Sequence, residues 1–123
     1  MTQIVVTDVN APIVVGDNWS NVGTITSNGA TLDISGYTIT CSIHDERDLA
    51  NPLISAHAVA ITTAASGIVT LTITAAESAT LHANPLTPSD GVWHIADFKA
   101  VSGGGAIVHT DPWRILVRRK VTA

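Results

Sequence analysis

The chain has 123 residues, of which 46% are apolar and 13% charged, and its formal net charge is −4. This length suits one domain with a single core and is too short for two. The composition is rich in Thr, Ser, Gly and Asn, which is typical of strands and turns and argues against disorder throughout. No apolar run approaches the roughly 18 residues that span a bilayer, and the first residues lack the basic start and cleavage site of a secretory signal. We therefore expect one soluble, unexported domain over 1–123 with no membrane partner.

Charge is distributed unevenly along the chain. Residues 1–113 hold all ten acidic residues and only two cations, Arg47 and Lys99, which gives −8, whereas the last ten residues hold four cations and give +4. An acidic body that ends in a basic strip argues against wrapping nucleic acid and favours an oriented protein contact. The alternative is a solvated edge strand that its positive charge protects from aggregation.

The N-terminal part of the chain predicts short strands. Ile4–Val6 and Ile13–Val15 are apolar pieces separated by a turn-forming segment that ends at Pro12, and Trp19–Thr26 is another candidate strand. Pro12 suits an edge position or the start of a strand, because proline cannot donate a hydrogen bond to a neighbouring strand.

The clearest strand begins at Tyr37 and ends near His44. Apolar and polar residues alternate strictly there, so Tyr37, Ile39, Cys41 and Ile43 should face inward. Cys41 is the chain's single cysteine and cannot form an internal disulfide. We expect it to be a small core residue that needs no oxidising compartment.

The next segments predict a hairpin that leads into a short helix. Leu53–Thr62 is a plausible strand that the turn at Ser66-Gly67 would pair with the alternating strand Ile68–Thr74. A helix of at most about two turns is expected over Ala75–Leu81, since Thr74 can cap its first turn and Glu77, three residues later, can complete a capping box.

The C-terminal part predicts two paired strands. Gly91–Val101 and Ala106–Val121 flank the glycine-rich loop Ser102–Gly105. With these, the chain has seven or eight short strands and no long helix, which predicts an all-β antiparallel sandwich or barrel. The predicted core consists of Ile39, Cys41, Ile43, Val69, Leu71, Ile73, Trp93, Ile95, Ile115 and Val117.

Several segments in order resemble the N-terminal immunoglobulin-like domain of phage baseplate upper proteins, over about residues 13–122. The matching motifs are Val15–Trp19, Leu32–Tyr37, Pro52–Ile54, Ser66–Leu81, Gly91–Trp93 with the later Ala96–Lys99, and Ile115–Val117. The resemblance implies an Ig-like β-sandwich and a structural place in a tailed-phage virion (tail, baseplate or head-to-tail region), assembled in the host bacterial cytoplasm. It implies other virion proteins as partners and a homo-oligomer within the particle. No catalytic residue accompanies this module.

Chemistry-bearing residues give little support to an enzyme. The five histidines lack the close pairing with Cys or carboxylate that zinc sites have, and His94 and His109 are the only pair that strand pairing could bring together. Asp45, Glu46 and Asp48 gather in one loop, which favours a solvated loop over a calcium site because the EF-hand pattern is absent. No nucleophile elbow or phosphate loop is present. We therefore expect no catalytic, metal or cofactor site, and a small metal-dependent enzyme stays a formal alternative.

The predicted function is that of an adaptor whose basic C-terminal strand docks on a neighbour. If Ile115 and Val117 face inward, then Arg114, Leu116, Arg118 and Lys120 lie on the outer face. We expect this strip to bind a neighbouring copy, head to tail, with the Asp45, Glu46 and Asp48 loop as its acidic target. The alternative function is a carbohydrate-binding or host-surface-binding module, in which Trp93 or Trp113 would be exposed as a stacking platform.

Overall fold

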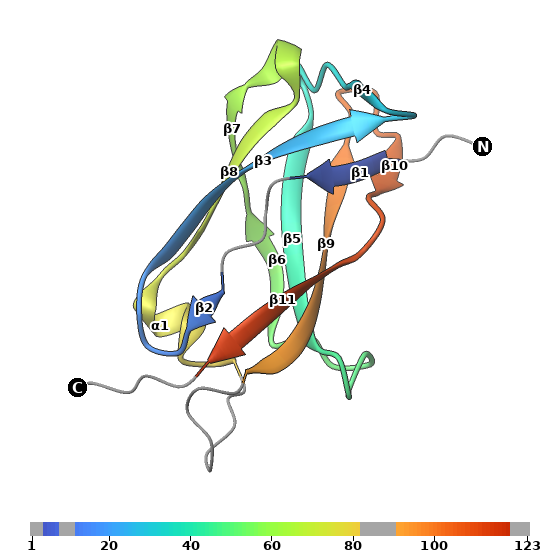
Figure 1. The fold of residues 1–123 in the computed structure, drawn as a ribbon. Coiled ribbons are helices and arrows are strands. Elements are labelled where there is room, and N and C mark those ends of the chain that lie inside the picture. The colour runs from blue at the N-terminus through green and yellow to red at the C-terminus, as the bar shows by residue number, and fades with distance from the viewer. Residues whose placement is uncertain (1–3, 8–11, 82–90, 119–123) are drawn as a thin grey trace.

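The computed structural model describes residues 4–7, 12–81 and 91–118. Two β-sheets pack face to face, as the two layers of arrows in Figure 1 show, and the described helices are only the 3₁₀ turn η1 (Ala64–Ser66) and α1 (Ala75–Ser78). The predicted all-β sandwich is confirmed. Neither of these described helices has the length or apolar character to cross a membrane.

One sheet has five strands, and all of its pairings are antiparallel. Its order is β1 (Ile4–Thr7), β3 (Trp19–Ser27), β8 (Ile68–Ile73) and β7 (Ala60–Thr63), and β4 (Ala30–Thr31) pairs with the end of β3. The second sheet has six strands and one parallel pairing, between its first two members. Its order is β2 (Ile13–Val14), β11 (Trp113–Arg118), β9 (Val92–Val101), β5 (Thr38–Asp45) and β6 (Ile54–Ala58), with β10 (Ile107–His109) on β9.

The strand order is that of an immunoglobulin-like sandwich. The first, second, fifth and fourth long strands of such a domain form one sheet, and the third, sixth and seventh form the other. Here β1, β3, β8 and β7 occupy the first set of places, and β5, β9 and β11 the second, with β6 extending the second sheet. Eleven strands are described rather than seven or eight, because short pieces such as β2, β4 and β10 each form their own pairings.

The segment predicted as one strand over Leu53–Thr62 divides between the sheets. Its first half is β6, which pairs with β5, and its second half is β7, which pairs with β8 as predicted. The buried Val59 lies at the crossing, and its N–H donates to the Ile39 carbonyl at 3.0 Å. A bend of this kind lets one stretch of chain serve both layers of a sandwich.

The core fills the space between the sheets largely as predicted. Ile39, Cys41 and Ile43 of β5 are buried, and so are Val69, Leu71 and Ile73 of β8 and Ile115 and Val117 of β11. Each of these isoleucine, valine and leucine side chains stabilises the fold by roughly 1.5–3 kcal/mol through burial alone. Burial also raises the pKa of the Cys41 thiol, and the negative charge of Asp97 adds to this. The thiol is therefore a neutral core group, as expected.

The predicted orientation of β9 was wrong. Trp93 is 43% exposed and Ile95 is only partly buried, whereas His94, Ala96, Phe98 and Ala100 face the core. In a strand, alternate residues share a face, so burying Trp93 and Ile95 would also bury Asp97 and Lys99. Phe98 fills the core instead, and its ring meets Trp113 edge to face at 4.8 Å.

Candidate interaction surface

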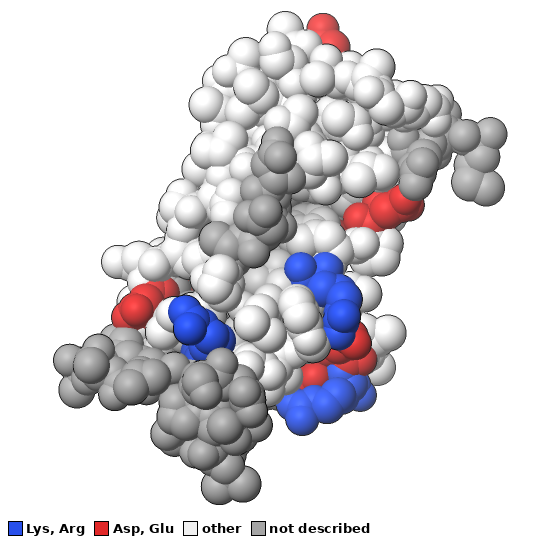
Figure 2. Space-filling model, in the orientation of Figure 1, with Lys and Arg blue, Asp and Glu red and all other residues white. Residues whose placement is uncertain are grey.

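Among the described strands, charged residues occur in only one of the two sheets. No described strand of the five-stranded sheet contains Asp, Glu, Lys, Arg or His, whereas the strands of the six-stranded sheet carry both signs of charge. In Figure 2, lysine and arginine side chains gather on the lower half of the visible face, around β11, with carboxylates beside them. The outer face of the six-stranded sheet is therefore the candidate interaction surface.

The centre of this surface is an aromatic and ionic cluster formed by Trp93, Arg114 and Glu46. The Arg114 guanidinium lies over the Trp93 ring, 4.2 Å from its centroid. Its Nε and Nη2 donate to the two carboxylate oxygens of Glu46 at 2.7 and 3.2 Å. Residues 68 positions apart thus meet because β11 and β5 flank β9, and the sequence contained no local signal for this contact.

The acidic loop after β5 has a different structure from the one expected. Asp45 is buried, and its carboxylate accepts hydrogen bonds from the backbone N–H of Arg47 at 2.9 Å and from that guanidinium at 3.0 and 2.7 Å. Asp48 instead accepts from the side-chain amide of Asn51. The three carboxylates of the loop therefore bind separate partners, and the described residues contain no group of three or more metal-ligating side chains.

The rest of the predicted strip has the orientation expected of β11. Arg114 is exposed and Leu116 and Arg118 are half-buried, while Ile115 and Val117 face the core. Leu116 packs against Gly91, where an added Cβ would lie within 3 Å of the leucine side chain. Lys120 lies outside the described residues.

The strip and the acidic loop of one molecule lie on the same surface. The Arg114–Glu46 ion pair joins them within the chain. The head-to-tail contact between copies stays a prediction, and it would have to replace this internal pair with the same pair between two molecules. Asp45 is already bound by Arg47, so Glu46 and Asp48 are the acidic residues of the loop that a neighbour can reach.

Shallow hollows follow β9 along this face. One of about 320 Å³ is lined by Trp93, Glu46 and Arg47. Another of about 240 Å³ is lined by Ile95, Leu49 and other residues. These hollows are open, which suits contact with another surface better than enclosure of a small molecule.

The histidines are not brought together as a ligand pair. His94 is buried, and its Nδ1 lies 3.0 Å from the Val92 carbonyl oxygen. His109 is exposed and its Nδ1 is 3.2 Å from the Asp97 carboxylate. The prediction that strand pairing could bring His94 and His109 together was wrong, because His109 lies opposite Lys99 in the β9–β10 pairing.

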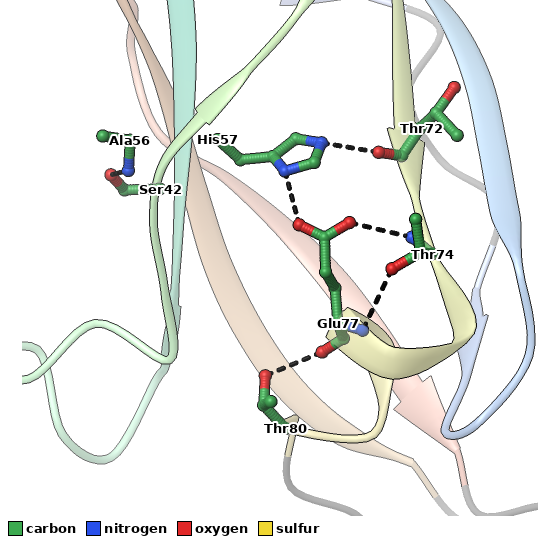
Figure 3. Close-up of polar contacts among 7 residues, drawn as sticks. All are labelled: Ser42, Ala56, His57, Thr72, Thr74, Glu77 and Thr80. Carbon is green, nitrogen blue, oxygen red and sulfur yellow. Dashed lines mark hydrogen bonds and ion pairs between the residues drawn. The ribbon is translucent and has the colours of Figure 1, made fainter.

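A second polar cluster, which the sequence did not reveal, joins the two sheets at one edge of the sandwich. Figure 3 shows His57 of β6 between Glu77 of α1 and the backbone of Thr72 in β8. The capping box predicted at this helix is confirmed, since Thr74 accepts from the Glu77 N–H at 3.2 Å and Glu77 accepts from the Thr74 N–H at 3.0 Å. The Thr74 hydrogen bond is the main cause that lowers the pKa of the Glu77 carboxyl.

No family model and no curated protein matches the chain. Among solved structures, similarity is found to a chain of the structure described as the structural basis of T cell specificity and activation by the bacterial superantigen toxic shock syndrome toxin-1. The match has 12% sequence identity and a TM-score of 0.45, and it covers 98% of this chain and 100% of that chain. A likeness at this level supports no conclusion about fold or function.

Proposed function

We propose that this chain is a non-enzymatic structural adaptor of a tailed-phage particle and that it binds neighbouring virion proteins through the outer face of the six-stranded sheet. The observation that carries this proposal is that, among the described strands, charged residues and the exposed Trp93 occur only in the six-stranded sheet. Tryptophan and arginine are the residues most enriched among those that dominate protein interfaces. The sequence resemblance to the Ig-like domain of phage baseplate upper proteins supports the virion as the setting.

The Trp93–Arg114 pair is suited to binding because it is already ordered. Glu46 accepts hydrogen bonds from two donors of the Arg114 guanidinium, which holds the group over the indole ring. An ordered side chain loses less conformational entropy on association than a free one. The guanidinium has five N–H donors, so donors remain for a carbonyl or carboxylate of a neighbouring protein.

The proposal is tested by incorporation of the chain into particles. Particles assembled with a tagged chain are purified and imaged with gold-labelled antibody, and the wild-type chain is expected at one defined position. The variant Trp93→Ala/Arg114→Ala should be lost from particles. The matched control Val22→Ala removes a side chain that is 51% exposed on the five-stranded sheet, and it should be incorporated normally. Absence of the wild-type chain from particles, or normal incorporation of the double variant, would contradict the proposal.

A second candidate function is binding of carbohydrate or of a host surface, and the exposure of Trp93 favours it. Arg114 covers one face of the indole ring, so at most the other face can stack on a sugar. The variant Arg114→Ala separates the two functions. It should uncover the ring and strengthen glycan binding on an array if Trp93 is a sugar platform, whereas it should weaken incorporation into particles if the Trp93–Arg114 pair binds protein.

A further inference from the structure

His57 lies where the free edges of the two sheets meet. It belongs to β6, the edge strand of the six-stranded sheet, and the chain continues from there into β7, the edge strand of the five-stranded sheet. The side chain of His57 is 18% exposed, and it crosses from its own sheet to β8 and α1 of the other layer, as Figure 3 shows. The ring therefore makes a polar connection between the layers.

Both ring nitrogens of His57 face oxygen atoms that can only accept hydrogen bonds. Nδ1 is 2.6 Å from the Glu77 carboxylate, and Nε2 is 2.6 Å from the Thr72 carbonyl oxygen. A neutral imidazole has one N–H, and a charged imidazolium has two. The charged ring therefore donates to both oxygens, whereas either neutral tautomer places a nitrogen lone pair against an oxygen.

We propose that protonation of His57 controls the opening of the edge strand β6. The charged ring holds β6 against the other sheet, and the strand opens more readily when the ring becomes neutral. The groups around the ring are consistent with this role. Among the described residues, Glu77 supplies the only carboxylate that pairs with the ring, and its second oxygen accepts from the Thr74 N–H. Opposite His57 on β5 lies Cys41, whose buried thiol is neutral, and the described strands β7 and β8 contain no titratable residue.

Strand β6 is weakly paired with β5 along its middle. The β5–β6 register shifts between Cys41 and Ile43. Ala56 has a left-handed backbone with φ 52°, and its N–H donates to the Ser42 hydroxyl at 3.3 Å rather than to a strand carbonyl. An interrupted edge strand opens more readily than a central one. Loss of one hydrogen bond at His57 therefore has a local effect on β6.

The test is amide hydrogen exchange of the wild-type chain at several pH values, with each rate divided by that of an unstructured peptide at the same pH. The reporters are the N–H groups of Leu53 and Val59, which bond to the Ile43 and Ile39 carbonyls at either end of β6. A charge-assisted hydrogen bond changes opening on the order of tenfold. We expect protection to fall by that factor as the pH is raised from mildly acidic to alkaline, because the ring is charged at the first and neutral at the second. Constant protection over this range would overturn the proposal.

The variant Glu77→Gln gives the sharpest second outcome. Glutamine can keep the capping box, but its amide N–H₂ would then donate to Nδ1, so the neutral ring with its proton on Nε2 would satisfy both contacts. The fall in protection with pH should disappear or reverse, and far-UV circular dichroism checks that the fold is kept. The matched control is His109→Asn, which removes an exposed histidine of the same six-stranded sheet, on β10. In this variant, protection should fall with pH as in the wild-type chain. If protection in Glu77→Gln fell with pH as much as it does in the wild-type chain, the proposal would also be overturned.

Discussion

Replacement of Gly67 by alanine should destabilise the domain more than the same change at Gly36, which also has a positive φ. Gly67 has φ +69°, and a Cβ there would lie 2.5 Å from the Ile25 carbonyl oxygen and 2.8 Å from that of Leu32. The shorter distance is about 0.9 Å inside ordinary contact at 3.4 Å. Both oxygens belong to backbone, and the Ile25 N–H donates to the Gly67 carbonyl at 2.8 Å, so neither can move alone.

The expected magnitude has two parts. A left-handed backbone costs an alanine about 1–2 kcal/mol, and forcing apart a packed contact adds about 1–3 kcal/mol. Gly67→Ala should therefore lower the free energy of unfolding by about 2–5 kcal/mol. Gly36 has φ +78° with no atom within 4 Å of its added Cβ. Gly36→Ala should therefore lower the free energy of unfolding only by the cost of the left-handed backbone, about 1–2 kcal/mol.

Urea denaturation of the two variants, followed by tryptophan fluorescence, measures this difference. Because 1 kcal/mol shifts Tm by roughly 4 °C in a domain of this size, thermal melts should separate the variants as well. Equal losses at Gly67 and Gly36 would refute the close approach of the turn before β8 to β3 and its neighbouring segment.

Three other changes test the core, the cap and the docking strip. Leu71→Ala removes a fully buried side chain and should cost about 2–5 kcal/mol; an unchanged urea midpoint would contradict the register of β8. Because the folded-state pKa of Glu77 is lowered from 4.5, the stability it contributes is present above pH 4.5 and lost as pH falls through the lower folded value. Glu77→Gln should therefore flatten the acid limb of the stability curve measured by urea titration. Arg118→Glu/Lys120→Glu should abolish oligomers or incorporation into particles, because it reverses the charge of the strip. Arg118 is half-buried, so circular dichroism checks that the fold is kept; normal assembly at low salt would mean that the strip is only a charged edge.

The sequence predicts those strands well in which every inward position is apolar and every outward position polar. β5 satisfies this rule from Thr38 to His44 and β8 satisfies it from Val69 to Ile73, and the buried apolar residues of these two stretches were predicted correctly. β9 does not, because Trp93 and Ile95 share a face with Asp97 and Lys99 while His94 shares one with Phe98. The charged pair at the end of the strand was the better guide, since a charge is far more expensive to bury than an indole is to expose.

Contacts that depend on which strands become neighbours could not be predicted. Nothing near His57 in the sequence indicates that Thr72 and Glu77 will enclose its ring, because the bend after Ala58 moves the chain from one sheet to the other. The Arg114–Glu46 pair depends in the same way on β9 lying between β11 and β5. The local capping box at Thr74 and Glu77, in contrast, needs only a spacing of three residues and was predicted correctly.

The distribution of charge over the two sheets explains why a count along the chain was an incomplete guide to the interaction surface. The count separates an acidic body from a basic end, which predicts opposite poles and a head-to-tail contact between copies. In the folded chain Glu46 of the body and Arg114 of the basic end form one ion pair beside Trp93. Exposed ion pairs are worth little to stability, so the main consequence of this one is to order the side chains of the surface. A partner that approaches the six-stranded sheet therefore meets an ordered patch of mixed charge around an indole, whereas the described strands of the other sheet contain no charged residue and offer hydroxyl groups, apolar groups and the amide of Asn21.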